Sequence, residues 1–155
     1  MAAGSSDAAE RVHELLERIA SATGVEATIE IHEDEASVEA NYVGEDLGLL
    51  IGHHGQTIDA IQHLAYRFGA RGAVTRKSVE VDASGYRERR AEILRGDGDR
   101  AAEIAIRERR PVSLEAMSAL ERKVVHEHLK DRHDVETYSE GEEPSRHLVV
   151  APLVE

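Results

Sequence analysis

The sequence of 155 residues contains no cysteine, only three prolines and few aromatic side chains. Without cysteine it can form neither a disulfide nor a thiolate metal site. Aromatic residues make up 3% of the chain and hydrophobic residues 41%, so we predict a core of aliphatic side chains. No apolar run reaches the length of a membrane span. The first residues lack the basic and apolar segments of a signal peptide, and we therefore expect a soluble, cytoplasmic protein.

Positive charge is also scarce. The chain has 19 lysine and arginine residues against 31 acidic ones, a formal net charge of −12. The deficit is uneven, since residues 1–83 carry a net charge of −9 and residues 84–155 a net charge of −3. Such a chain is not expected to bind nucleic acid indiscriminately, so any nucleic-acid site must be a local patch on an acidic body. The same acidic excess also keeps a protein soluble, a role that is compatible with binding.

The most informative segment present is a short apolar run that ends in a Gly-x-x-Gly loop, Leu49-Leu50-Ile51-Gly52-His53-His54-Gly55. After the loop, apolar residues recur at the spacing of one buried helical face: Ile58, Ile61, Leu64, Ala65 and Phe68. Two glycines that join two helices allow a tight turn without a Cβ in the way. Such a turn can approach a phosphate backbone and present N–H groups at a helix N-terminus. The pattern resembles the KH domain, whose loop clamps about four nucleotides of a single strand.

The rest of the first half fits a KH domain of type II. Hydrophobic periodicity predicts a helix over residues 7–21, followed by strands over residues 25–32 and 36–42. A short helix is predicted over residues 46–51, and a second one from the loop to about Phe68, with Gly69 as its C-cap. A third strand contains Val79 and Val81. The resulting order, α-β-β-α-α-β, extends the resemblance over residues 5–83. A basic connector, residues 71–77, precedes the last strand, and we count Arg76 and Lys77 among the candidate RNA contacts.

The second half is predicted to form a small α/β unit. A long helix is expected over residues 86–109, and the sequence leaves open whether Gly96 and Gly98 break it. A short strand follows over residues 111–116. Ser118-Ala-Leu-Glu121 is a capping box that starts a helix at about residue 119. Two further strands are predicted over residues 135–138 and 147–150, joined by a turn-rich segment.

Basic side chains gather on one side of the capped helix. Arg122, Lys123, His126 and Lys130 fall in one arc of about 100°. Leu120, Val124, Val125 and Leu129 lie in the arc that faces away. A cationic stripe opposite an apolar one is commonly just a solvated helix face. The wider pattern is more specific: Arg-x-x-x-His within Met117-Ser-x-Leu-Glu-Arg-Lys-Val-Val-His, followed by Asp134-Val-Glu-Thr-Tyr-Ser-Glu-Gly-Glu-Glu-Pro-x-Arg. It resembles the R-3-H domain, a module that binds single-stranded nucleic acid.

A KH domain followed by an R-3-H domain resembles the Jag family of bacterial RNA-binding proteins, also called KhpB or EloR. The resemblance implies an α+β fold, with residues 1–83 as the KH domain and residues 84–155 as the R-3-H domain. It implies a cytoplasmic, non-enzymatic regulator that binds single-stranded RNA and is linked to cell elongation, division and shape. It also implies a smaller KH protein, or a second copy of the chain, as a partner.

Carried over by position, the clamp is Gly52, His53, His54 and Gly55, and the second site is Arg122 and His126. Two departures from the family pattern stand out. KH loops usually carry Lys or Arg between the glycines, where this sequence has two histidines. Members of the family often have an additional N-terminal domain, whereas only about six residues precede the first predicted helix here, so functions of that extension are not expected.

Two other classes of function fit parts of the sequence. A metal-dependent nuclease would need converging ligands, and His126, His128 and His133 superficially resemble such a cluster. Helical geometry sets His126 and His128 about 200° apart, and we interpret His128 as a core or interface residue. No phosphate-loop or hydrolase motif is present, so we predict no metal and no cofactor. The acidic first half favours a third class, a protein-interaction adaptor that keeps the KH fold with little RNA binding.

Overall fold

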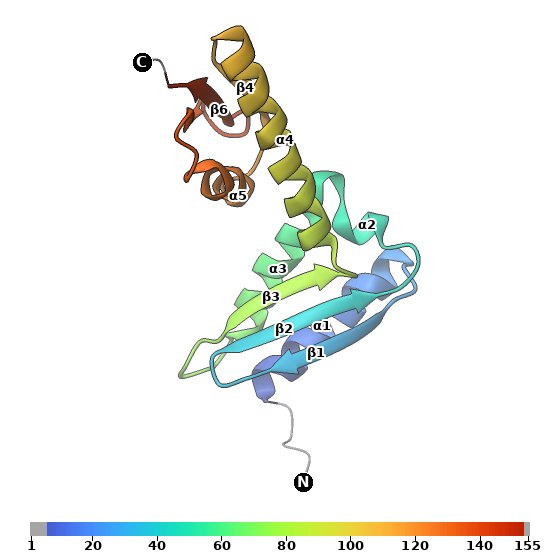
Figure 1. The fold of residues 1–155 in the computed structure, drawn as a ribbon. Helices are drawn as coiled ribbons and strands as arrows, with labels where there is room; N and C mark the ends of the chain where they lie inside the picture. Colours follow the sequence, from blue (N-terminus) through green and yellow to red (C-terminus); the bar gives the residue numbers. More distant parts are fainter. Residues whose placement is uncertain (1–5, 154–155) are drawn as a thin grey trace. The chain divides into compact units, whose positions relative to one another are not determined.

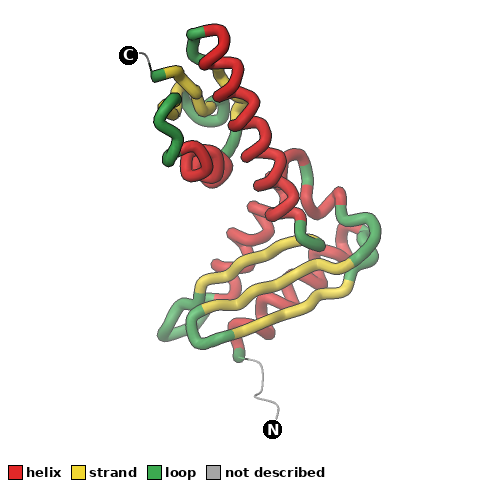
Figure 2. The backbone as a smooth tube through the Cα atoms, viewed as in Figure 1, coloured by secondary structure: helices red, strands yellow, loops and turns green. Residues whose placement is uncertain are grey.

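The computed structural model describes residues 6–153, and the chain divides into two compact units at Arg87 and Glu88. The extreme N-terminus, to which the expected absence of a signal peptide refers, lies outside the described residues. Each unit combines helices with a three-stranded sheet (Figures 1 and 2), which confirms the predicted α+β class. Within residues 6–153 no helix has both the length and the apolar character needed to cross a membrane.

The first unit has the predicted order of elements. These are α1 (Asp7–Thr23), β1 (Thr28–Glu33), β2 (Ser37–Val43), α2 (Gly48–Ile51), a 3-10 turn η1 (His53–Gly55), α3 (Gln56–Gly69) and β3 (Ser78–Ala83). The strands lie in the order β1-β2-β3; β1 and β2 are antiparallel, and β2 and β3 are parallel. Helices α1 and α3 pack against each other on one face of this sheet, and Figure 1 shows its other face uncovered.

The core of the first unit is aliphatic, as its composition predicts. Val12 and Leu16 of α1, Val38 of β2 and Ile58 of α3 are fully buried. Tyr42 is the aromatic exception in this core, and its hydroxyl donates to the Leu16 carbonyl at 2.7 Å. Burial raises the pKa of the Tyr42 phenol above its usual range, because the charged form loses its hydration.

Gly69 has a different role from the predicted one. It is the last residue of α3, and Ala70, in right-handed helical conformation, is the C-cap. A Cβ at Gly69 would lie 3.1 Å from Cγ2 of Val12, so the glycine lets α3 approach α1 closely. The first predicted strand is also shorter than expected, because β1 begins at Thr28 rather than at Val25. Residues 25–27 connect α1 to the sheet.

The second unit contains α4 (Tyr86–Glu108), which begins at the end of the first unit, and then β4 (Val112–Ala116), α5 (Ala119–Leu129), β5 (Val135–Glu140) and β6 (His147–Pro152). The strands form an antiparallel sheet in the order β4-β6-β5. Helix α4 continues without a break through Gly96 and Gly98. A Cβ at Gly98 would lie 2.9 Å from Cγ1 of Val125, so this glycine lets α4 pack closely on α5.

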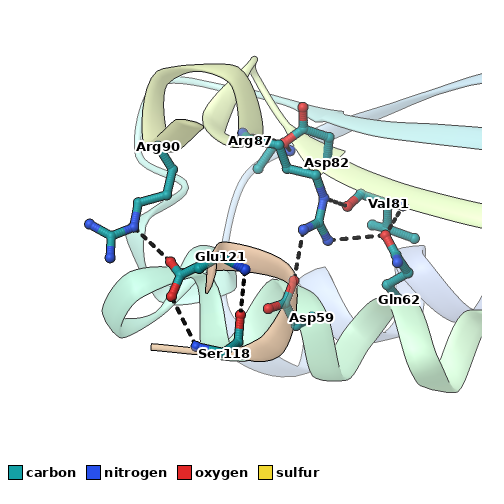
Figure 3. A network of polar contacts seen from close by, with 9 residues as sticks. Asp59, Gln62, Val81, Asp82, Arg87, Arg90, Ser118 and Glu121 are labelled. Carbon is teal, nitrogen blue, oxygen red and sulfur yellow. Dashed lines mark hydrogen bonds and ion pairs between the residues drawn. The ribbon is translucent and has the colours of Figure 1, made fainter. Parts of the chain in front are cut away.

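The capping box at the start of α5 is confirmed and does more than cap. Ser118 Oγ accepts from the Glu121 amide, and Glu121 Oε2 accepts from the Ser118 amide, both at 3.2 Å. The other carboxylate oxygen of Glu121 accepts from Arg90 Nε of α4 at 2.7 Å (Figure 3). Both side chains of this ion pair are more than four-fifths buried. The cap therefore also fixes α5 to α4.

Two expectations for α5 were wrong. Leu120, placed in the apolar arc, is 63% exposed, because it lies on the opposite side of α5 from the buried residues Val125 and Leu129. His128, interpreted as a core or interface residue, is exposed, and its Nε2 lies 2.9 Å from the carboxylate of Asp99 on α4. A polar partner on the neighbouring helix holds this ring at the surface.

Candidate nucleic-acid interface

The Gly-x-x-Gly loop is built around two glycines that no other residue could replace without strain. Gly52 has φ +73° and Gly55 has φ +78°, a region that side chains with a Cβ rarely adopt. A Cβ at Gly52 would lie 2.8 Å from Cβ of Thr57, and a Cβ at Gly55 would lie 2.7 Å from Cε1 of Tyr86. The loop therefore turns as tightly as the sequence predicted, and both glycines make room for side chains of the domain itself, Thr57 and Tyr86.

The two histidines between these glycines stack on each other. The ring centroids of His53 and His54 are 3.9 Å apart, with 26° between the ring planes. His54 has a positive φ of 51°, in the left-handed region. His53 is exposed and His54 is half-buried. The loop thus presents an imidazole pair with His53 outermost.

Helix α3 begins directly after the loop, and no side chain caps its N-terminus. Its first-turn N–H groups and the positive end of its dipole therefore favour an anion there. Asp59 is the acidic residue of this first turn, and its carboxylate is paired with Arg87 Nη1 at 2.7 Å (Figure 3). Arg87 also donates to the Val81 carbonyl at 2.9 Å. This pairing offsets the negative charge closest to the helix start.

Arg76 and Lys77 are not brought to this loop. They precede Ser78, which pairs with Ser37 at the hairpin end of β2, whereas Gly55 contacts Tyr86 beyond the other end of β3. Lys77 Nζ lies 2.6 Å from Glu33 Oε1 and donates to the Asp34 carbonyl at 2.6 Å. The hydrogen bond from Lys77, together with those from Ser6, lowers the pKa of Glu33 to about 2. Lys77 thus joins the hairpin to β3.

The uncovered face of the first sheet is acidic. Two cross-strand rows lie on it, Glu30–Asn41–Asp82 and His32–Glu39–Glu80, and Glu39 faces Glu80 directly. These side chains line a shallow hollow of about 580 Å³. Like charges at directly opposed positions destabilise a sheet and repel phosphate. Electrostatics therefore disfavour a nucleic acid on this face, and the loop is the more favourable place for one in the first unit.

In the second unit, Arg122 does not lie on the solvated face predicted for it. The residue is only 8% exposed. Its Nη1 donates to the Met117 carbonyl at 2.6 Å, and its Nη2 donates to Glu143 Oε1 at 2.9 Å. Arg122 therefore ties the start of α5 to the connection between β5 and β6. No local spacing could indicate the partner, because Glu143 lies 21 residues further along in a turn-rich segment.

The other three members of the basic arc, Lys123, His126 and Lys130, are exposed. Nδ1 of His126 lies 2.5 Å from Thr137 Oγ1 of β5, which fixes the ring against the sheet. Lys130 Nζ lies 2.7 Å from Glu127 Oε2, and this hydrogen bond raises the pKa of the Lys130 ammonium. The arc therefore consists of one buried cation and three exposed basic groups.

The histidines that suggested a metal site do not converge. His126 contacts Thr137 and His128 contacts Asp99, on opposite sides of α5. Among residues 6–153 no group of three or more histidine or acidic side chains has the arrangement to hold a metal ion.

Comparison with known protein families finds two matching domains in this chain. Residues 9–82 match the KH domain of KhpA and KhpB, and residues 94–152 match the R-3-H domain. The chain has a KhpA/KhpB-type KH domain followed by an R-3-H domain. The resemblance to the Jag family inferred from the sequence is thereby confirmed. The Gly-x-x-Gly loop lies within the KH match, and Arg122 and His126 lie within the R-3-H match.

Several curated relatives align with most of this chain. It is 36% identical over 140 residues to the RNA-binding protein KhpB of Clostridium symbiosum, an alignment that covers 89% of this chain and 63% of the relative. It is 34% identical over 138 residues to KhpB of Bacillus subtilis, covering 88% and 66%. For KhpB of Lactiplantibacillus plantarum the identity is 37% over 128 residues, covering 83% and 40%. The chain thus spans about two-fifths to two-thirds of the length of these relatives.

Proposed function

We propose that this protein binds single-stranded RNA through the Gly-x-x-Gly loop of its KH domain. The loop geometry carries the proposal, because two glycines with positive φ form a tight turn directly before the N-terminus of α3, which no side chain caps. The pairing of Asp59 with Arg87 removes the nearest electrostatic obstacle. The names of the relatives, RNA-binding proteins in each case, support the same function.

The R-3-H domain supplies a second contact in this proposal. Lys123, His126 and Lys130 are its exposed basic groups on α5. Arg122 acts as a positioning residue, because its guanidinium is buried between Met117 and Glu143. Arg76 and Lys77 lie at the other end of the KH sheet from the loop, and they form no part of the clamp.

The wider role proposed for the protein follows from the Jag resemblance. It is a cytoplasmic binder rather than an enzyme, a post-transcriptional regulator linked to cell elongation, division and shape. A smaller KH protein, or a second copy of the chain, is its proposed partner. Crosslinking of the protein to RNA in cells, followed by sequencing of the bound RNA, would identify the targets and test the regulatory role.

One observation favours a second candidate function, that of a protein-interaction adaptor. The acidic sheet face of the KH domain, with Glu39 opposite Glu80, would suit a basic protein partner better than RNA. The adaptor needs no RNA contact at the loop, so the two candidates differ in what happens when the loop is changed.

The decisive experiment replaces both loop histidines by aspartate in the full chain. Two carboxylates beside the phosphates should weaken binding of a short single-stranded RNA about tenfold or more, equivalent to about 1.4 kcal/mol. Fluorescence anisotropy of a labelled oligonucleotide measures this, and circular dichroism checks the fold. A matched control is His32→Asp on the acidic sheet face, which should leave affinity unchanged. Equal affinity of the loop variant and the wild type would contradict the loop assignment, and absence of RNA binding by the wild type would favour the adaptor.

A further inference from the structure

The stacked pair His53 and His54 offers something that a lysine or arginine in a KH loop does not. The two rings, whose centroids are 3.9 Å apart, form an aromatic surface. Such a surface is unusual in this chain, because Phe, Trp and Tyr make up only 3% of it. A contact to phosphate would use the N–H edge of an imidazole, and it would not require the two rings to stack. The first-turn amides of α3 already supply donors for a phosphate at this loop. The phosphate contact therefore leaves the stack without a role, and the exposed His53 ring is the member that a second contact could use.

The geometry of the pair fits the stacking of a nucleobase. The two imidazoles lie face to face, with 26° between their planes, and form a stack with a flat outer ring. His53 is the exposed member, and His54 supports it from the half-buried side. A planar ligand can continue this stack on the outer side of His53. Stacking on side-chain rings, histidine included, is a common way in which proteins hold unpaired RNA bases.

We propose that His53, supported by His54, is a stacking platform for one base of the RNA strand held at the Gly-x-x-Gly loop. The proposal rests on the proposed function of the loop and adds a base contact to its backbone contact. Stacking tolerates every base, because each has a π face. Its strength grows with the size of that face, so the platform gives the loop a preference for a purine at one position of the strand.

Two double variants of the full chain separate stacking from charge. His53→Phe with His54→Phe keeps rings and removes every polar atom from them. His53→Lys with His54→Lys keeps positive charge and removes the rings. Both are titrated with a series of short single-stranded RNAs in which 2-aminopurine, a base whose fluorescence falls on stacking, occupies each position in turn. His32→Ala, on the acidic face of the same domain, is the matched control.

If His53 is a stacking platform, the wild type and the His32→Ala control should both quench the fluorescence of 2-aminopurine at one position of the strand. The phenylalanine variant keeps this quenching and an affinity within about threefold of wild type. The lysine variant loses the quenching, and an abasic nucleotide at that position weakens wild type about tenfold while leaving the lysine variant unchanged.

Quenching that survives in the lysine variant, or binding without quenching at any position, would overturn the platform while leaving the loop as a backbone clamp. Loss of affinity in the phenylalanine variant alone would also overturn it, because the contact would then be polar. A wild type that binds none of these RNAs contradicts the proposed function itself, so the two failures are distinct.

Discussion

The two candidate RNA contacts are built in different ways. The KH loop is a backbone site: its shape comes from Gly52 and Gly55, and the groups that would meet phosphate are helix N–H groups. The contact on α5 of the R-3-H domain is a side-chain site: the buried Arg122 anchors the start of α5, and a hydrogen bond between His126 and Thr137 fixes one exposed group. A backbone site needs no buried charge and few partners. A side-chain site depends on groups that are distant in sequence.

The largest expected effect tests whether the side-chain site depends on its buried cation. Arg122→Met keeps much of the length of the side chain and removes its hydrogen bonds to Met117 and Glu143. Hydrogen bonds to charged groups contribute about 1.5–3 kcal/mol each, and Glu143 is 61% exposed, so we expect a loss of about 2 kcal/mol in the R-3-H domain. Amide hydrogen exchange, read separately for residues 88–155, measures it.

Lys123→Met is the matched control for this change, since it removes an exposed charge from the neighbouring position. It should alter stability by less than about 0.5 kcal/mol. An Arg122→Met variant that keeps its stability but binds RNA more weakly would show that Arg122 contacts RNA directly. Stability would then be unchanged in Arg122→Met, while the slope of log affinity against log salt would fall by about 0.7.

This difference also decides how far the sequence can predict each domain. The KH clamp is predictable because its signal is local: two glycines, an apolar run before them and a helical period after them. The role of Arg122 is not, because its partner, Glu143, is 21 residues away, in a segment with no periodicity. A helical arc calculated from spacing assigns a direction to a side chain, and the packing of α4 and of the sheet against α5 decides which direction is buried.

The glycines show the same limit. At Gly52 and Gly55 the motif itself indicates a turn, and both have positive φ. At Gly69 and Gly98 the sequence suggests a cap and a possible break, whereas both glycines allow close packing of one helix on another. Close packing is a property of two elements, so one element's sequence does not reveal it. The stack of His53 on His54 is likewise hidden from the sequence, because adjacency along the chain does not indicate how two rings are oriented.

A smaller effect on stability is expected at Gly96 and Gly98 of α4, whose different roles the sequence does not indicate. Gly96→Ala should stabilise the R-3-H domain by about 1 kcal/mol, because the added Cβ meets only the end of the Arg100 side chain, at 3.5 Å. Gly98→Ala should lose that gain, because its Cβ would lie 2.9 Å from Val125. Thermal unfolding of both variants measures the difference. An equal gain at both positions would mean that α4 and α5 are less closely packed than the structure shows.

The KH domain has its own side-chain cluster, away from the loop, and it predicts a dependence on pH. Hydrogen bonds from Lys77 and Ser6 lower the pKa of Glu33 from 4.5 to about 2. The folded state therefore gains stability from this carboxylate at pH above about 4.5, and loses it as the pH falls toward 2. Glu33→Gln should remove about 1 kcal/mol at pH 7 and nearly nothing at pH 2. Urea unfolding at several pH values measures this, and a loss that is the same at pH 2 and pH 7 would contradict it.

The smallest expected effect concerns the exposed side of α5. If Lys123 contacts one phosphate, Lys123→Gln should weaken RNA binding only a few-fold and lower the salt slope by about 0.7. The effect should be the same for many RNA sequences, because a phosphate contact carries no base information. The loop variants should instead change which position of the strand is held. Measuring affinity at several salt concentrations, for a purine-rich and a pyrimidine-rich strand, separates the two behaviours. A Lys123→Gln variant with an unchanged salt slope would leave the KH loop as the principal contact and reduce α5 to a solvated helix face.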